Sequence, residues 1–324
     1  MVRAKTAVGV DLGGSNVRAA VIDQDGKVLS VFRDNLGQHN LPESVVAVVA
    51  DAINRVLLVA SLSIDQLVGI GIGIAAQLAD NQGTVAVSPN LGWRNVAFGD
   101  LLQAALGRRV RVVNDVDAIA WGEATHGAAV GHRDVLTVFV GTGVGGGLVL
   151  NGRLYAGSSG VPAEIGHIKV RPQGAECGCG GRGCLEAYLG GVNLSRRLRK
   201  AAETDWPALR QKASGDLAHV HPGLVEELLI EKDPRAADLF EELAGMFGLV
   251  LANAVTLLNP SALVLGGTVL QGCPTLMKLS EEVLRKQSLD VTNAALKIYT
   301  AKLGDNAGII GAGSLVMASG RKVE

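Results

Sequence analysis

The chain has 324 residues, of which 48% are hydrophobic, and a formal net charge of -1 at pH 7. This length predicts two domains, because single hydrophobic cores stop growing near about 250–300 residues. The near-neutral charge argues against nucleic acid as a partner, since it offers no broad basic surface. We also expect no apolar run of the ~18 residues that cross a bilayer and no signal peptide, which predicts a cytoplasmic protein that does not enter membranes.

The first third of the chain predicts a strand-rich opening followed by alternating helices and strands. Residues 6–12 (TAVGVDL) are typical of a buried strand, and the glycine turn GGSN follows them. Residues 43–60 have the apolar spacing of an amphipathic helix. The remaining patterns predict strands at 17–23, 28–34, 67–74 and 109–115, turns and short strands over 79–95, and helices at 97–107 and 117–127.

The opening pattern returns at residue 136. Residues 136–157 again read as strand, glycine turn, strand and hairpin. Two such openings predict an internal duplication with a nucleotide bound between the halves. The remaining segments predict mostly helix over 190–257, a strand entering a glycine turn over 261–269, a strand over 297–303 and a last helix over 306–318.

Two glycine turns between strands are candidates for binding phosphate. They are DLGGSN, residues 11–16, and GTGVGG, residues 141–146. Such turns expose successive backbone N–H groups, and Ser15 and Thr142 add hydroxyl donors, so two facing turns could clamp a triphosphate. Asp11 is placed to hold Mg²⁺ through water, and Arg18 to reach the phosphates. The alternative is that the glycines serve tight hairpins and nothing more.

Other nucleotide motifs do not fit. The pattern G-x-G-x-x-G/A occurs from Gly71 and from Gly141, but strand-like sequence follows in both cases, where a dinucleotide site needs a helix. A P-loop motif is absent from the sequence.

Three of the four cysteines lie close together, and a histidine precedes them. Cys177, Cys179, Cys184 and His167 offer three thiolates and an imidazole, which make a closed tetrahedral zinc site of architectural type. A disulfide with spare thiols, or inert buried cysteines, is the alternative interpretation. The fourth, Cys273, stands alone, and we expect no chemistry from it.

A polar pair ends the strand over 109–115. Asn114 and Asp115 stand at the strand end, where ligands meet the sheet in open α/β folds. A carboxylate at this place could accept a proton from a bound hydroxyl, so Asp115 is a candidate general base. Both residues are equally good caps for the helix that follows.

A family resemblance joins these features. The string E-x-G-H at residues 164–167, followed by C-x-C-G-x-x-G-C-x-E at residues 177–186, resembles the signature of the ROK family of bacterial sugar kinases and sugar-responsive repressors. The resemblance implies an α/β, two-domain actin-like (ribonuclease H-like) ATPase fold with a structural zinc site. It implies a smaller α/β domain over 1–117 plus 306–324, with the first phosphate loop and part of the sugar site. The larger α/β domain, 118–305, would hold the second phosphate loop, the zinc site and the adenosine site.

The resemblance also implies ligands and contacts. It implies ATP, Mg²⁺ and structural Zn²⁺, with His167 both on zinc and facing the sugar. The phosphate contacts are Asp11, Gly13, Gly14, Ser15, Asn16, Arg18, Gly141, Thr142 and Gly143, and the adenosine contacts are Gly266 and Gly267. The sugar contacts are Asn90, Asn114, Asp115, Glu164, His167 and Glu186, with Asp115 as the catalytic base. The family more often has GGT where this chain has GGS, which keeps the hydroxyl.

The expected function is an ATP-dependent glucokinase that makes glucose 6-phosphate. Ala75 and Ala76 replace a Pro-Gly pair of many ROK glucokinases, which leaves mannose, fructose, allose, N-acetylglucosamine and N-acetylmannosamine as alternative hexoses. A sugar-sensing repressor is a different class, but such proteins carry an N-terminal helix-turn-helix and here only about five residues precede the first strand. A sugar-binding protein without catalysis is the third alternative. Family analogy implies a homo-oligomer, either a dimer or a tetramer.

Overall fold

The computed structural model describes residues 5–318, and their contacts divide the chain into two units. Unit 1 comprises Met1–Thr137, Gly147–Ala163 and Tyr299–Glu324, and unit 2 comprises Val138–Gly146 and Glu164–Ile298. The predicted boundaries, 1–117 plus 306–324 against 118–305, stay a prediction, and residues 1–4 and 319–324 of the smaller predicted domain lie outside the described residues.

A five-stranded sheet organises unit 1, and the predicted strands form it. Its order is β3-β2-β1-β4-β8, with β1 antiparallel to β2 and parallel to β4. The strands are β1 (Thr6–Leu12), β2 (Asn16–Asp23), β3 (Val28–Asn35), β4 (Ile70–Ile74) and β8 (Val110–Asn114). A separate three-stranded sheet holds β5 (Gln77–Leu78), β6 (Val85–Ser88) and β7 (Trp93–Val96).

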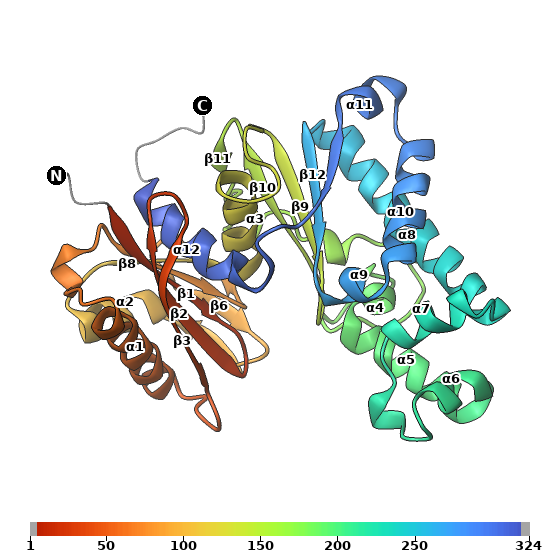
Figure 1. The fold of residues 1–324 in the computed structure, drawn as a ribbon, viewed down its shortest axis with the longest axis horizontal. Coiled ribbons are helices and arrows are strands. Elements are labelled where there is room, and N and C mark those ends of the chain that lie inside the picture. Colours follow the sequence, from red (N-terminus) through yellow and green to blue (C-terminus); the bar gives the residue numbers. More distant parts are fainter. Residues whose placement is uncertain (1–4, 319–324) are drawn as a thin grey trace. The chain divides into compact units, whose positions relative to one another are not determined.

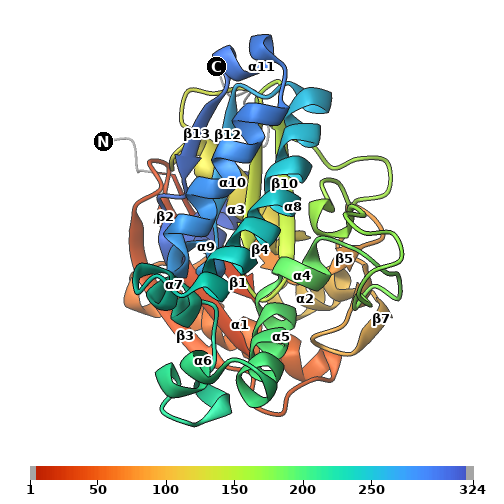
Figure 2. The same ribbon diagram turned by 90° about the vertical axis from the view of Figure 1, so that its right-hand side faces the viewer.

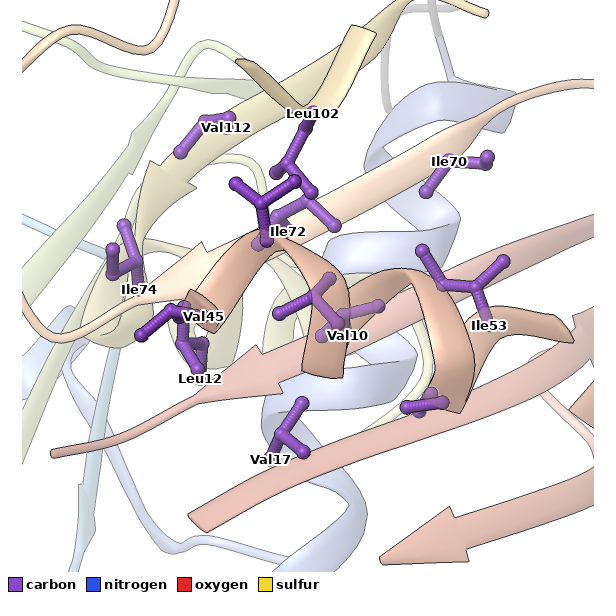
Figure 3. Close-up of a cluster of buried hydrophobic side chains, with 14 of the residues drawn as sticks. Val10, Leu12, Val17, Val45, Ile53, Ile70, Ile72, Ile74, Leu102 and Val112 are labelled. Atoms are coloured by element: carbon purple, nitrogen blue, oxygen red, sulfur yellow. The ribbon is translucent and has the colours of Figure 1, made fainter. Parts of the chain in front are cut away.

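Helices α1 (Pro42–Val59) and α2 (Phe98–Leu106) supply the apolar partners of this sheet. Figure 3 shows Val45 of α1 beside Leu12 and Ile74 of the strands and Ile53 on the side of Ile70, and all five side chains are fully buried. Burying such a side chain contributes roughly 1.5–3 kcal/mol relative to exposure. The regularly spaced apolar residues that predict an amphipathic helix therefore form the buried face of α1.

Helix α12 (Ala307–Met317), the last predicted helix, packs on β1, on β4 and on α3 (Asp115–Thr125). Figure 1 shows α12, in blue, beside β1. Glycines make this approach close: a Cβ at Gly9 would overlap the carbonyl oxygen of Ile309, and one at Gly71 that of Ala312. The glycine match at Gly71 therefore serves helix packing.

Replacing Gly311 by alanine should destabilise unit 1. The new Cβ would overlap the carbonyl oxygen of Ala118 on α3, and backbone cannot swing aside as a flexible side chain can. We expect Gly311→Ala to lower the free energy of unfolding by about 3 kcal/mol, as strong overpacking does. The matched control is Gly245→Ala: apart from its chain neighbours and the backbone of its own helix, no atom of residues 5–318 lies within 4 Å of the new Cβ, and better helix propensity should stabilise by about 0.5–1 kcal/mol. Urea unfolding measures both; equal midpoints for the two variants would contradict the packing.

The second five-stranded sheet has the order β11-β10-β9-β12-β13. Its strands are β9 (Val135–Val140), β10 (Val144–Leu150), β11 (Arg153–Leu154), β12 (Ala262–Gly266) and β13 (Lys297–Thr300). Counted along the chain, both sheets place their third, second, first, fourth and fifth strands in that order. This shared order is what the predicted internal duplication requires.

Residues 186–295 are mainly helical, as predicted for 190–257. Its helices are α4 (Glu186–Leu189), α5 (Gly191–Thr204), α6 (Pro207–Lys212), α7 (Gly223–Ile230), α8 (Pro234–Leu258), α9 (Thr268–Gly272), α10 (Pro274–Gln287) and α11 (Asp290–Ala295). The longest, α8, packs along α10, and Figures 1 and 2 both show the two side by side. The side chain of Asp233 caps its start by accepting the N–H groups of Arg235 and Ala236.

The expectation about apolar runs is wrong for α8. By length and composition alone, Pro234–Leu258 is long and apolar enough to cross a membrane. However, 56% of its apolar window is buried inside the protein, which is typical of the core helix of a soluble protein. The run is long because α8 is a core helix of unit 2, with buried apolar residues along most of its length.

Candidate functional site

The first glycine turn closes the β1–β2 hairpin in unit 1. Gly13 N–H donates to Asn16 O (2.9 Å), and Leu36 N–H donates to Ser15 O (2.8 Å). Asn90 packs directly on this turn, because a Cβ at Gly14 would lie 2.6 Å from the Cβ of Asn90. The structure thus places a predicted sugar contact against a predicted phosphate loop.

Asp11 and Arg18 face each other across β1 and β2. Burial raises the pKa of Asp11, while the Arg18 guanidinium lowers it in part and the Asp305 carboxylate raises it. Arg18 Nη1 donates to Asp305 O (2.5 Å), and Nη2 lies 3.8 Å from Asp305 Oδ2. Asp305 was not predicted, and no local signal could find a partner 287 positions away. The start of α12 also lies against Asp11, since a Cβ at Gly308 would sit 3.0 Å from Asp11 Cγ.

Asp11→Asn should make the protein more stable. Because burial raises the pKa of Asp11 in the folded state, its ionised form costs stability, and that cost appears as the pH rises through the unfolded-state pKa toward the folded one. At pH 7 we expect Asp11→Asn to raise Tm by about 2–4 °C, as a gain of about 1 kcal/mol does in a domain of this size. The gain should shrink as the pH is lowered toward 4. Asp25→Asn, an exposed hairpin residue, is the control and should leave Tm unchanged; thermal unfolding that shows a lower Tm for Asp11→Asn would contradict the burial cost.

The Ala75–Ala76 segment follows β4, and its peptide groups form hydrogen bonds within the protein. Ser88 Oγ donates to Ala75 O (3.0 Å), and Asn114 Nδ2 donates to Ala76 O (3.1 Å). Ala75 N–H donates to Leu12 O (3.1 Å) at the end of β1. The pair that replaces Pro-Gly is therefore anchored on three sides.

Asn114 and Asp115 lie at the junction of β8 and α3. Asn114 Oδ1 accepts the N–H groups of Val116 (2.8 Å) and Asp117 (3.3 Å), so the capping interpretation is confirmed for this residue. Asp115 is the first residue of α3, and its Oδ1 accepts the N–H of Val116 (3.0 Å). Asn114 thus fixes the start of the helix that carries Asp115.

The second glycine turn lies between β9 and β10 in unit 2, and the start of α5 holds it. Gly191 N–H donates to Gly141 O (2.8 Å), and Val192 N–H donates to Thr142 O (3.1 Å). The predicted adenosine contact Gly267 lies beside the same strand end: its φ is +97°, and a Cβ there would overlap Val140 O. Only glycine fits that position.

The three cysteines and His167 form one cluster, and their ligand atoms all lie within 4.8 Å of one another. Cys177 Sγ is 3.7 Å from His167 Nδ1, and Cys179 Sγ is 3.7 Å from Cys184 Sγ. Tetrahedral Zn²⁺ with Zn–S bonds of about 2.3 Å sets sulfurs about 3.7–3.8 Å apart, whereas a disulfide needs about 2.05 Å. The separations therefore fit a metal and not the disulfide alternative, and all four cysteines are free thiols.

The surroundings differentiate the thiols. Burial raises the pKa of Cys177 to about 12, whereas a hydrogen bond from the backbone of Gly181 lowers the pKa of Cys179. Lys169 Nζ lies 2.8 Å from Cys184 Sγ, and this bond raises the pKa of Lys169. No pattern in the sequence marked Lys169. A cation beside a thiolate cluster offsets part of its negative charge.

Two predicted glutamates adjoin the cluster. His167 presents Nδ1 to Cys177 and Nε2 to Glu164, whose Oε2 is 3.7 Å away, so the two ring nitrogens face different partners. Glu186 Oε2 accepts the N–H of Val144 (2.9 Å), and its Oε1 lies 3.7 Å from Cys177 Sγ. Glu164 and Glu186 thus adjoin the cluster that contains His167 in unit 2, while the other predicted sugar contacts belong to unit 1.

Comparison with known proteins gives consistent matches. The sequence profile of the ROK family matches residues 7–319. The glucokinase of Streptomyces coelicolor is 32% identical over 312 residues, which are 95% of this chain and 96% of that one. A crystal structure of a ROK family glucokinase from Streptomyces griseus in complex with glucose and AMPPNP is 34% identical, covers 96% of this chain and 98% of that chain, and superposes with a TM-score of 0.77. The xylose repressor of Bacillus subtilis is 26% identical, and the match covers 97% of this chain and 78% of the repressor.

The histidine of E-x-G-H and the three cysteines of C-x-C-G-x-x-G-C-x-E form a single cluster in the structure. A family profile spans nearly the full length, and relatives reach 30% identity or more over that length. The chain belongs to the ROK family.

Proposed function

We propose that this chain is an ATP-dependent hexokinase of glucokinase type, which transfers the γ-phosphoryl group of ATP to the 6-hydroxyl of glucose. The observation that carries the proposal is the likeness to the Streptomyces griseus glucokinase, whose crystal structure contains glucose and AMPPNP, at 34% identity over 96% of this chain. The glucokinase of Streptomyces coelicolor supports it at 32% identity.

The roles proposed for individual residues follow from what phosphoryl transfer requires. The reaction needs positioned donors for the phosphates, a metal ion for their charge and a carboxylate for the attacking hydroxyl. The two glycine turns, at equivalent places in two sheets of the same order, supply the donors within an actin-like ATPase fold. Asp11 would hold Mg²⁺ through water. Asp115, at the start of α3, would orient the sugar hydroxyl and take its proton.

Zinc fits the cluster in unit 2. His167, Cys177, Cys179 and Cys184 would hold it, because their separations match a tetrahedral set of three sulfurs and one nitrogen. Four protein ligands leave no open position for an activated water, so the ion would supply structural order to the segment between His167 and Glu186. The ordered segment would then hold three groups in place to bind sugar hydroxyls: the Glu164 carboxylate, His167 Nε2 and the Glu186 carboxylate.

The alternatives differ in substrate or class. Because Ala75–Ala76 stands in place of Pro-Gly, another hexose is an alternative substrate, such as mannose, fructose, N-acetylglucosamine or N-acetylmannosamine. The repressor alternative is less favoured, because the identity to the xylose repressor is 26%, whereas the identity to the two Streptomyces glucokinases is 32% and 34%. We also propose a cytoplasmic homo-oligomer that binds neither nucleic acid nor membranes.

A coupled assay for sugar 6-phosphate across a panel of hexoses, with ATP and Mg²⁺, tests the proposal. We expect glucose to have the highest kcat/KM. Faster turnover of another hexose would replace glucose as the substrate, and no turnover of any sugar by metal-loaded protein would favour a sugar sensor.

A further inference from the structure

The Cys/His cluster and the second glycine turn are parts of one hydrogen-bonded assembly in unit 2. Cys184 is a predicted metal ligand, and Glu186 follows it by two residues at the start of α4. The carboxylate of Glu186 spans two structures, since Oε2 accepts the N–H of Val144 and Oε1 lies 3.7 Å from Cys177 Sγ. This one side chain therefore connects the metal loop to the glycine turn.

The fit between Glu186 and the turn is tight. A Cβ at Gly143 would overlap Glu186 Oε2, and a Cβ at Gly190 would lie 2.9 Å from Glu186 Cγ and 3.3 Å from Gly143 Cα. Asn193 Nδ2 donates to Glu186 O (3.1 Å) and ties the same residue to α5. The glycines at 143 and 190 are thus needed to bring the carboxylate against the backbone.

This assembly fixes where the turn directs its N–H groups. The carbonyls of Gly141 and Thr142 accept bonds from the start of α5, and both peptides are trans. In a trans peptide the N–H points opposite to the C=O, so the N–H groups of Thr142 and Gly143 point away from α5. Glu186 fixes the next peptide in the same way, because it holds the N–H of Val144 while Gly143 O accepts the N–H of Gly141 (3.0 Å). Donors aligned in this manner form an anion-binding turn.

We propose that Glu186 is a positioning residue that couples metal binding at the Cys/His cluster to nucleotide affinity at the second glycine turn. Metal ligation would hold Cys177 and Cys184 in place, and Cys184 would position the start of α4, where Glu186 lies. The Glu186 carboxylate then restrains the turn through its hydrogen bond to the N–H of Val144. The inference rests on the proposed function, since it takes the turn as the phosphate site, and it gives Glu186 a role besides the predicted sugar contact.

The test measures nucleotide affinity without sugar, so that a sugar contact cannot contribute. Isothermal titration with Mg-AMPPNP is run on zinc-loaded and chelator-treated protein, for wild type and Glu186→Ala. We expect zinc removal to weaken wild-type affinity about tenfold, the effect of losing one hydrogen bond to a charged group. Glu186→Ala should be weakened about as much while zinc-loaded, and zinc removal should then change it less than twofold. Wild-type affinity in Glu186→Ala, or an undiminished zinc effect in that variant, would overturn the proposal.

Two further variants separate positioning from general damage. Glu186→Gln keeps an oxygen that can accept the N–H of Val144, so its affinity should stay within about threefold of wild type. Glu176→Ala removes an exposed carboxylate from the same metal loop, where its partner is Arg182 (2.7 Å), and should behave as wild type. Weakening by Glu176→Ala equal to that by Glu186→Ala would contradict a specific role for Glu186.

Hydrogen exchange distinguishes failure of the coupling from failure of the proposed function. We expect zinc removal, or Glu186→Ala with zinc present, to raise amide exchange at residues 141–146 about tenfold. Unchanged exchange in both cases would refute the coupling. If amide exchange rises as expected but the protein binds no nucleotide, the link between the metal cluster and the turn is supported and the proposed kinase function is refuted.

Discussion

Asp115→Asn should slow phosphoryl transfer by about 10²–10⁴-fold while the fold is retained. The substitution keeps the size of the side chain at the start of α3 and removes the proton acceptor. General base catalysis contributes about 10²–10⁴-fold, so we expect kcat to fall by that factor with ATP and the preferred hexose. The change should appear in kcat with little change in the KM for ATP, because Asp115 is proposed to act on the sugar hydroxyl.

Asp100→Asn is the matched control for this prediction. Asp100 is likewise an aspartate in the first turn of a helix of unit 1, but it is exposed on α2. Its substitution should leave kcat unchanged. If Asp115→Asn retained more than a tenth of wild-type kcat, Asp115 would be only a helix-start residue, and the base would have to be sought elsewhere.

Removing the metal should be the largest stability effect in the chain. The segment between His167 and Glu186 has few buried apolar side chains, so metal ligation is the main source of its order. We expect a chelator, or Cys184→Ser, to lower Tm by about 10 °C or more and to abolish activity, and added Zn²⁺ to restore the chelated wild type but not the variant. Tm and metal content per chain measure the effect.

Cys273→Ala provides the control for metal removal. Cys273 is buried in unit 2, and burial raises the pKa of its thiol to about 12, which is typical of an inert core cysteine. This variant should keep one zinc per chain and its activity. Wild-type protein that holds no metal, or that melts at the same temperature after chelation, would contradict the zinc assignment.

Much of the fold could be predicted because its signals are local. The meander over β1–β3, the repeat of that pattern at β9 and the spacing of α1 all follow from apolar periodicity and turn residues. Helix α10 had no prediction: the middle of its buried face is Ser280, whose hydroxyl donates to Leu276 O (2.7 Å) and interrupts the apolar stripe. Helix α8 falls in the predicted helical region over 190–257, but the length of its apolar run was misjudged, although composition alone reveals it.

In the candidate site too, contacts between residues close in sequence could be predicted and contacts between distant residues could not. The Cys/His cluster was predictable because its residues are close in sequence and metal chemistry restricts their types. The partner of Arg18 and the bond between Glu186 and Val144 were not, because they join residues 287 and 42 positions apart without any pattern that pairs them. Asn114 was correctly placed at a strand end, but only the structure shows that its side chain both caps α3 and holds Ala76.

The most direct test of the central claim is to follow the phosphoryl group itself. Wild-type protein is incubated with glucose and equimolar Mg-ATP, and ³¹P NMR records the fate of the γ-phosphate. We expect the γ signal of ATP to disappear while signals of ADP and glucose 6-phosphate grow in equal amounts. Intact ATP, or release of inorganic phosphate without sugar phosphate, would contradict that claim.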